Sequence, residues 1–167
     1  MNKHTLILGL GNDILMDDGI GIRLCREMQH YFTDEAISFE TASLGGLEIL
    51  ELIQGYNNVI FIDAIKTKDG IPGTVYYFQP SDFKETSNLS NLHDVSFLTA
   101  LEIGKKLNMK IPESMHIIAV EIIEDLTFGE DFTPEIQDKF PEIIVQVRDI
   151  IDKILKQPIN LAGLCHL

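Results

Sequence analysis

The sequence predicts an α/β protein with a mostly parallel sheet covered by helices on both faces. Segments with strand patterns alternate with segments of helical periodicity, which is typical of successive βαβ units. Thr5–Leu10 is a short, continuous apolar run, as expected for a buried parallel strand, and Asn58–Ala64 is the run richest in β-favouring residues. In such sheets, functional sites form beyond the carboxyl ends of the strands. The residues that close each predicted strand are therefore the first candidates for chemistry.

The first half of the chain predicts two helices and one further strand. Gly19–Phe32 is a predicted helix, because apolar residues recur at every fourth position from Ile20 and form a single stripe. Ala36–Ala42 is the second strand. Gly46–Ile53 is a short helix, and Gly55 is its expected stop because glycine readily ends helices.

The second half continues the alternation. Thr74–Gln79 and Met115–Glu121 are predicted strands, and Asp94–Leu107 is a predicted helix. Thr133-Pro134 opens another helix, with a cap residue followed by proline in the first turn. Pro141 is expected to break that helix and to begin a second one that ends near Leu155.

Two stretches are expected to lie outside regular structure. Lys66–Gly73 contains Lys-Asp-Gly and Pro-Gly, which are turn signals, and Ser81–Leu92 is a polar loop rich in Ser and Asn. Residues 157–167, after the last helix, are expected to form a C-terminal tail. At 167 residues the chain is expected to be one domain, 1–167.

Composition narrows the class of protein. Hydrophobic residues make up 45% and charged residues 23%, the values of an ordinary globular protein. The formal net charge of −13 argues against a nucleic-acid or anionic membrane surface, which needs clustered Lys and Arg. Cys25 and Cys165 fit neither a disulfide framework nor a zinc knuckle. Without a signal-peptide pattern or an apolar run of about 20 residues, a cytoplasmic protein is expected, most simply a monomer.

The turn after the first strand is the most informative stretch. Gly9 and Gly11 end the strand, and Asp17 and Asp18 stand just before the next helix. Glycine turns at helix starts usually bind phosphate, but two fixed negative charges would repel a polyphosphate. The turn therefore favours a cation. Either aspartate could instead serve as a helix cap, but one carboxylate suffices for that role.

Asp63 and His93 are the other two candidates. Asp63 closes the third strand, where a carboxylate is costly to bury unless it is paired, hydrogen-bonded or bound to a metal. His93 lies where the polar loop meets the following helix. Asp18, Asp63 and His93 would form a mixed oxygen and nitrogen set suited to Ni²⁺, Zn²⁺ or Mn²⁺. A turn cap for Asp63 and an exposed helix start for His93 are the structural alternatives.

The remaining histidines and a nucleotide site are weaker candidates. Of the four other histidines, His4 begins a strand and His30 ends a helix. His116 lies within a strand, and His166 belongs to the tail. Gly9-x-Gly11 is half of a dinucleotide fingerprint, and Glu40 could serve as its ribose acid. The third glycine is missing, since Ile14 takes its place. The chain also lacks His-Glu-x-x-His and any clear Ser-His-Asp or Cys-His arrangement.

The motifs together resemble the hydrogenase maturation endopeptidases. The resemblance runs in order from Thr5 to Leu155, and no single motif carries it alone. It rests on six motifs: Gly9-x-Gly11-Asn12 with Asp17-Asp18-Gly19-x-Gly21, a glycine-containing turn that leads into Leu47-Glu48-Ile49-Leu50, Ile62-Asp63-Ala64-Ile65, Pro72-Gly73-Thr74-Val75, His93 at a helix start, and Phe132-Thr133-Pro134-Glu135.

The resemblance implies a three-layer α/β/α sandwich and an endopeptidase. Such enzymes remove a C-terminal peptide from the large-subunit precursor of nickel–iron hydrogenase after nickel insertion. It also implies that Asp18, Asp63 and His93 contact Ni²⁺ carried by that precursor and serve in catalysis, although other divalent metals can occupy such a site. The sequence leaves open whether the metal is catalytic or only a recognition handle. A nickel chaperone without protease activity is the alternative.

Two positions depart from the family pattern. Asp18 stands where some members carry the longer Glu, so its reach to a metal differs by about one methylene. The turn Ser43-Leu44-Gly45-Gly46 lacks the Thr-containing glycine pattern often found there. The second departure concerns the choice of substrate more than activity.

Overall fold

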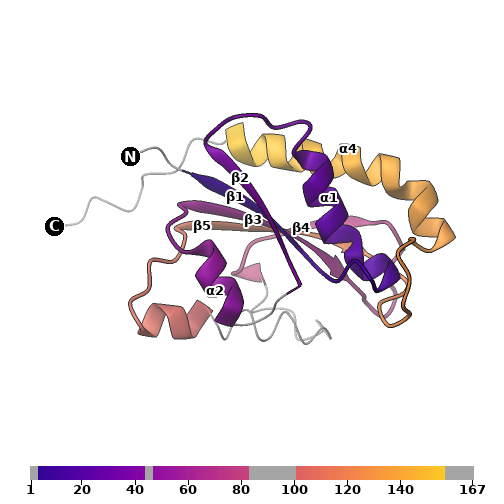
Figure 1. Ribbon diagram of the computed structural model, residues 1–167, viewed down its shortest axis with the longest axis horizontal. Helices are drawn as coiled ribbons and strands as arrows, with labels where there is room; N and C mark the ends of the chain where they lie inside the picture. The colour runs from indigo at the N-terminus through magenta and orange to yellow at the C-terminus, as the bar shows by residue number, and fades with distance from the viewer. Residues whose placement is uncertain (1–3, 44–46, 83–100, 157–167) are drawn as a thin grey trace.

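The computed structural model describes residues 4–43, 47–82 and 101–156, and within them five strands form one twisted sheet (Figure 1). The strands are β1 (Thr5–Leu10), β2 (Ile37–Ala42), β3 (Asn58–Ile65), β4 (Val75–Phe78) and β5 (Ser114–Glu121). Their order in the sheet is β2-β1-β3-β5-β4. The pairs β1–β2, β1–β3 and β3–β5 are parallel, and β4 runs antiparallel along β5.

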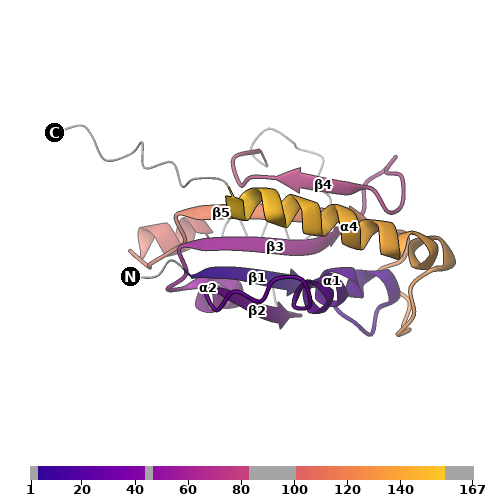
Figure 2. The same cartoon turned by 90° about the horizontal axis from the view of Figure 1, so that it is seen from above.

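Helices cover both faces of the sheet, which confirms the predicted α/β/α sandwich (Figures 1 and 2). The helices are η1 (Met16–Gly19), α1 (Ile20–Met28), α2 (Leu47–Ile53) and α4 (Pro134–Lys156), and residues 101–106 are also helical. One buried apolar cluster joins the sheet to α1 and α4. The other joins the opposite face to α2 and to Leu101.

The apolar strands supply both clusters because neighbouring side chains point to opposite faces. In β1, Ile7 belongs to the cluster under α1 and α4, whereas Leu6 and Leu8 belong to the other cluster. In β3, Ile62 and Phe61 divide in the same way. These side chains are at most 2% exposed, so the central strands are buried on both sides, as their apolar composition predicts.

Close contact at Gly21 fixes the start of α1 against the sheet. A Cβ at this position would lie 2.2 Å from the carbonyl oxygen of Leu10 and 2.3 Å from that of Ile62. Only glycine fits there, because real Cβ atoms do not approach backbone oxygens so closely. The first turn of α1 therefore rests directly on the carboxyl ends of β1 and β3.

Two helix boundaries differ from the prediction. The helix expected over Gly19–Phe32 is η1 followed by α1 and ends at Met28, because residues 29–31 turn the chain back toward β2. Phe32 nevertheless packs against the core, as its place in the apolar stripe predicts. The predicted break at Pro141 is wrong, since α4 runs without interruption through that residue.

Burial explains why α4 survives its proline. Proline inside a helix costs about 3 kcal/mol or more, since it removes one hydrogen bond and crowds the preceding turn. Four side chains on both sides of Pro141 are at most 1% exposed: Ile136, Ile143, Val147 and Ile151. Each buried isoleucine or valine contributes about 1.5–3 kcal/mol, so packing on the sheet outweighs the proline. Within the described residues, no helix is both long and apolar enough to cross a membrane.

Candidate active site

Asp18 stands at the carboxyl end of β1, in the short helix η1. The turn between them is compact, because a Cβ on Gly11 would lie 2.0 Å from the Asp18 carbonyl oxygen. Gly11 itself has φ +138°, a backbone conformation that favours glycine. The Asp18 side chain is half-buried, and its Oδ2 accepts a hydrogen bond of 2.9 Å from the backbone N–H of Asn12. The carboxylate is thus held in place by the glycine turn that precedes it.

Asp63 lies near the carboxyl end of β3, beside Ala119 of β5. It is half-buried, and its Oδ1 accepts a hydrogen bond of 2.8 Å from the backbone N–H of Ala64. The residue before it, Ile62, is the one against which Gly21 packs, and Asp18 lies three positions before Gly21. The structure therefore brings the two carboxylates to the same edge of the sheet, as the parallel topology predicts.

The third predicted ligand, His93, lies outside the described residues. Strand alternation puts Asp63 on the sheet face that also carries Phe61, and Leu101 covers that face. Among the described residues, no group of three or more His, Cys, Asp and Glu side chains could hold a metal ion. The described part of the site thus offers two carboxylates, oxygen donors that suit a divalent cation.

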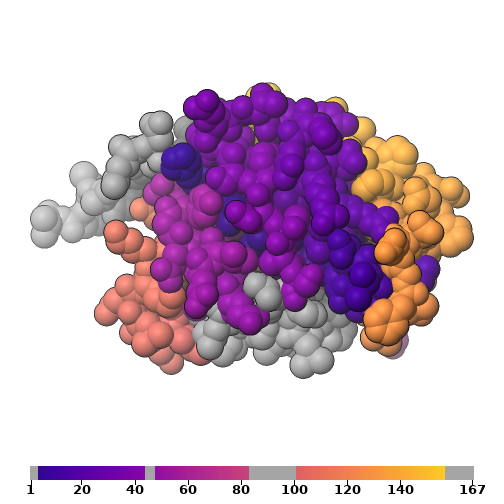
Figure 3. Space-filling view, viewed as in Figure 1, coloured from indigo at the N-terminus to yellow at the C-terminus, as the bar shows by residue number. Residues whose placement is uncertain are grey.

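Asp17 has a different role from the one that its sequence position suggests. It is completely buried, and neither η1 nor α1 has a side-chain cap. Its carboxylate instead accepts four hydrogen bonds of 2.7–3.2 Å, from the backbone N–H groups of Ile123, Glu124 and Thr133 and from the Thr133 hydroxyl. Asp17 therefore ties the connection between β5 and α4 to the turn that carries Asp18, and the two segments lie side by side in Figure 3.

Glu121 is a further acid at this end of the sheet that sequence reasoning did not single out. It closes β5 and is 1% exposed. Its carboxylate accepts hydrogen bonds from the backbone N–H of Thr67, at 2.6 Å, and from the Thr67 hydroxyl, at 3.0 Å. A Cβ on Gly70 would lie 2.0 Å from the Glu121 carboxyl carbon. The sequence signal that identifies Asp63 is an acidic residue at the end of a buried strand, and it applies equally to Glu121. In the structure Glu121 anchors the connection that follows β3.

The hydrogen bonding of the glycine turn disfavours a bound nucleotide. In a dinucleotide fold, backbone N–H groups of the first turn bind the pyrophosphate. Here the Asn12 N–H donates to the Asp18 carboxylate. A phosphate would have to displace a charged acceptor and then sit beside it, which Coulomb repulsion opposes.

A hydroxyl–imidazole chain lies at the opposite end of β5. The His116 ring is 2.7 Å from the Tyr77 hydroxyl through Nδ1 and 2.9 Å from the Ser114 hydroxyl through Nε2. His116 lies within a strand, as predicted, and is 7% exposed. The register partner of His116 in β3 is Ile60, three residues before Asp63. The hydroxyl–imidazole chain is therefore remote from the carboxylate edge. Among the described residues the hydrogen-bond partners of His116 are two hydroxyls and no carboxylate, so we interpret it as a structural element of the sheet.

The other nucleophile and histidine candidates do not join the site either. Cys25 is buried in α1, and burial raises the pKa of its thiol to about 11, so it is not a reactive thiolate. His4 and His30 are exposed, before β1 and after α1. Cys165 and His166 lie outside the described residues.

We predict that His116 makes folding stability fall as the pH is lowered. Burial lowers the pKa of His116 below its usual 6.5, so below that pH the unfolded chain takes up a proton before the folded chain does. The loss begins near pH 6.5, continues down to the lowered pKa, and reaches at most about 1.4 kcal/mol per pH unit. Urea unfolding of the wild type and of His116→Gln at pH 7.5 and pH 5.5 measures it. The stability gap between the two should narrow at pH 5.5, and a constant gap would contradict the prediction.

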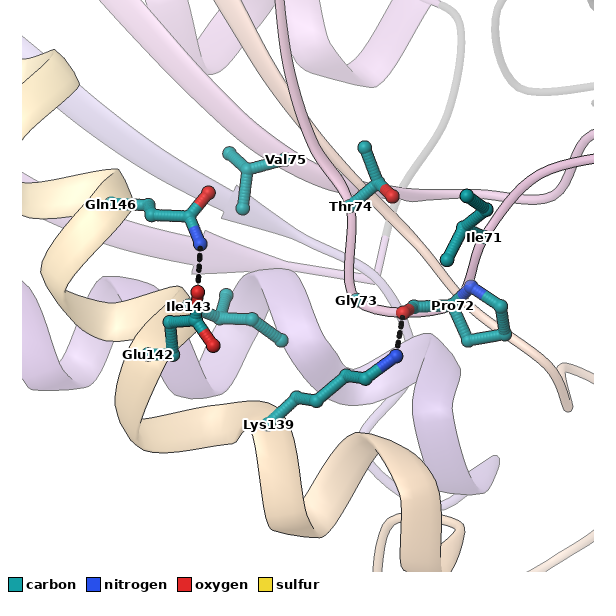
Figure 4. A pocket seen from close by; sticks show the side chains of 9 residues that line it. All are labelled: Ile71, Pro72, Gly73, Thr74, Val75, Lys139, Glu142, Ile143 and Gln146. Carbon is teal, nitrogen blue, oxygen red and sulfur yellow. Dashed lines mark hydrogen bonds between the residues drawn. The ribbon is translucent and has the colours of Figure 1, made fainter.

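A hollow of about 280 Å³ lies between α4 and the segment that leads into β4 (Figure 4). Its polar groups satisfy one another: the Lys139 ammonium donates to the Pro72 carbonyl at 2.7 Å and to Glu135 at 2.9 Å. Gln146 donates to Glu142 at 3.3 Å. Neither Asp18 nor Asp63 lines the hollow, so it is separate from the candidate active site.

Comparison with known proteins identifies the family. A family model described as Hydrogenase maturation protease matches residues 22–150. The chain belongs to the hydrogenase maturation proteases. The hydrogenase 2 maturation protease of Escherichia coli K12 is 31% identical over 123 residues, covering 67% of this chain and 75% of that protein. The protein is therefore a peptide hydrolase, and the predicted family resemblance is confirmed.

Two further comparisons agree with this membership of the hydrogenase maturation proteases. The hydrogenase expression/formation protein HupD of Thiocapsa roseopersicina is 24% identical over 148 residues, and the chain spans 65% of its length. The solved structure of the hydrogenase maturating endopeptidase HybD from E. coli superposes with a TM-score of 0.70 at 23% identity, covering 90% of this chain and 93% of that one. The second likeness shows that the fold is shared.

Proposed function

We propose that this protease removes the C-terminal peptide from the nickel-loaded precursor of a nickel–iron hydrogenase large subunit. The supporting observation is the pair of carboxylates, Asp18 and Asp63, at the carboxyl ends of adjacent parallel strands in a hydrogenase maturation protease. Carboxylate oxygens suit a divalent cation, and this edge is where sheets of this kind bind ligands. Nickel arrives as part of the substrate.

His93 is proposed as the third ligand. Residues 101–106 form a helix that packs through Leu101 on the same face as Asp63. This helix leads to Ser114 at the amino end of β5. His93 precedes it in the sequence, and an imidazole nitrogen would complete a set of two oxygen ligands and one nitrogen ligand.

In this mechanism the protein positions the substrate and accepts a proton from the attacking water. Asp18 and Asp63, together with His93, hold the nickel centre of the precursor, and this contact aligns the adjoining C-terminal segment across the edge. A positioned peptide reacts faster because the cost of orientation has been met on binding. A carboxylate at the edge accepts a proton from the attacking water, and Ni²⁺, when present, can polarise the scissile carbonyl.

Processing of purified precursors tests the proposal. The chain is mixed with nickel-loaded and with nickel-free large-subunit precursor, and intact masses are measured over time. Loss of a C-terminal fragment from the nickel-loaded form alone is the expected result. Equal cleavage of both forms would refute the nickel requirement. An uncut precursor together with intact Ni²⁺ binding would instead identify a nickel-binding protein without protease activity.

A further inference from the structure

The loop of residues 122–133, between β5 and α4, is built rigidly beside the candidate active site. Asp17 holds both of its ends, as described above. Its middle pairs with the first turn, since Gly129 N–H donates to the Ile14 carbonyl at 3.0 Å and Met16 N–H donates to the Gly129 carbonyl at 2.8 Å. Lys66, just after β3, forms an ion pair of 2.9 Å with Asp125.

This rigid loop presents large apolar side chains to water. Leu126 is 80% exposed and Phe128 is 79% exposed, and Ile14, on the strand-like segment that pairs with the loop, is 49% exposed. The Glu124 carboxylate fixes the tip by accepting hydrogen bonds from the N–H groups of Leu126 and Thr127, at 2.8 and 3.0 Å. We call Ile14, Leu126 and Phe128 the apolar rim.

The loop that carries Leu126 and Phe128 of the apolar rim is bonded to the two segments that follow the proposed carboxylate ligands' strands. Phe128 precedes Gly129, which bonds to Met16, and Met16 is two residues before Asp18. Asp125 pairs with Lys66, which is three residues after Asp63. In Figure 3 the loop, in orange, stands at the surface against the indigo residues of the first turn. A macromolecule that binds at the turn carrying Asp18 can therefore also contact the rim.

We propose that the apolar rim is the docking surface for an apolar patch of the hydrogenase large-subunit precursor, next to its nickel-bound C-terminal segment. The proposal rests on the proposed function. Clustered exposed apolar side chains mark protein interaction sites, and aromatic residues are enriched at the centre of such interfaces. The loop is held in place before binding, so little ordering entropy is lost when the precursor docks.

The precursor fits this surface better than a second copy of the chain does. A second copy seated on the rim would lie beside the turn that carries Asp18, and would compete with a substrate bound there. An apolar contact also suits a protein with a net charge of −13, because it attracts the precursor without requiring a basic partner.

The test separates docking from chemistry. Processing of the nickel-loaded precursor is measured over a range of precursor concentrations for the wild type and for Leu126→Ser/Phe128→Ser. The double variant should raise KM about tenfold, equivalent to about 1.4 kcal/mol, and leave kcat within about twofold. Leu107→Ser is the matched control, because Leu107 is 67% exposed and directly follows the helix of residues 101–106. In Figure 1 that helix, in salmon, lies at the opposite end of the molecule from the orange loop. The control should leave KM unchanged.

Each other outcome is decisive. An unchanged KM in the double variant, with normal processing by the wild type, would overturn the docking surface and leave the proposed function standing. A wild-type chain that leaves every precursor uncut would overturn the proposed function itself. A wild type that is dimeric by light scattering, and becomes monomeric in the double variant without a change in KM, would assign the rim to self-association. A fall in kcat with a lower urea midpoint would make the rim a structural element.

Discussion

Asp63→Asn is expected to abolish processing of the nickel-loaded precursor, with a loss of about 10³-fold or more in kcat/KM. Asparagine keeps the shape of the side chain and an oxygen that can accept the hydrogen bond from Ala64 N–H, which measures 2.8 Å in the protein. It removes the negative charge, and a neutral amide is a far weaker ligand for a divalent metal than a carboxylate. The fold should survive, because the change alters charge without altering volume.

The measurement is intact-mass processing alongside urea unfolding. Asp69→Asn is the matched control, since Asp69 is an exposed acid in the connection after β3 and its substitution makes the same change in net charge. The control should process at the wild-type rate. Full activity of Asp63→Asn would remove Asp63 from the mechanism, and an unfolded variant would show that the carboxylate stabilises the fold.

Asp17→Ala is expected to have the largest effect on stability. The substitution removes the acceptor of four hydrogen bonds and leaves the N–H groups of Ile123, Glu124 and Thr133 without it. A buried donor that loses its acceptor costs about 1–3 kcal/mol, so the unfolding free energy should fall by about 3–5 kcal/mol. That is a large part of the 5–15 kcal/mol typical of a domain. Urea unfolding measures the loss.

Asp13→Ala is the control for Asp17→Ala, because it removes the same charge from the same turn. Asp13 lies in the same turn but is 40% exposed, and its ion pair with Arg26 spans 3.3 Å at the surface. Exposed pairs contribute about 0.2–1 kcal/mol, so this variant should be nearly as stable as the wild type. Amide exchange adds a local test, because the N–H groups of Ile123 and Glu124 should exchange faster in Asp17→Ala only. Equal stability of the two variants would refute the anchoring role.

The strands were predictable because the local amino-acid composition of each segment indicates that it is buried. Thr5–Leu10 is confirmed as β1, and the predicted strands Ala36–Ala42 and Met115–Glu121 differ from β2 and β5 by one residue at the start. A continuous apolar run depends only on neighbouring residues, so a short window of sequence contains it. The break expected at Pro141 was wrong because the packing that keeps α4 intact comes from distant strands.

The candidate site was predictable only where topology places residues together. Asp18 and Asp63 follow parallel neighbouring strands, so their common edge follows from the sheet. The anchoring role of Asp17 joins residues more than 100 positions apart, and no local pattern distinguishes that carboxylate from its neighbour. Whether His93 completes the set remains a prediction, because it lies outside the described residues.

The carboxylate of Asp17 also sets an order of events during synthesis. Strands β1, β2 and β3 and helix α1 lie within the first 65 residues, so they can pair early. The donors that bury Asp17 are Ile123, Glu124 and Thr133, which the ribosome adds more than 100 residues later. Until they arrive, this carboxylate must remain hydrated, and closing so long a loop carries an entropic cost. The turn that carries Asp18 is thus among the first segments made and among the last to be fixed in place.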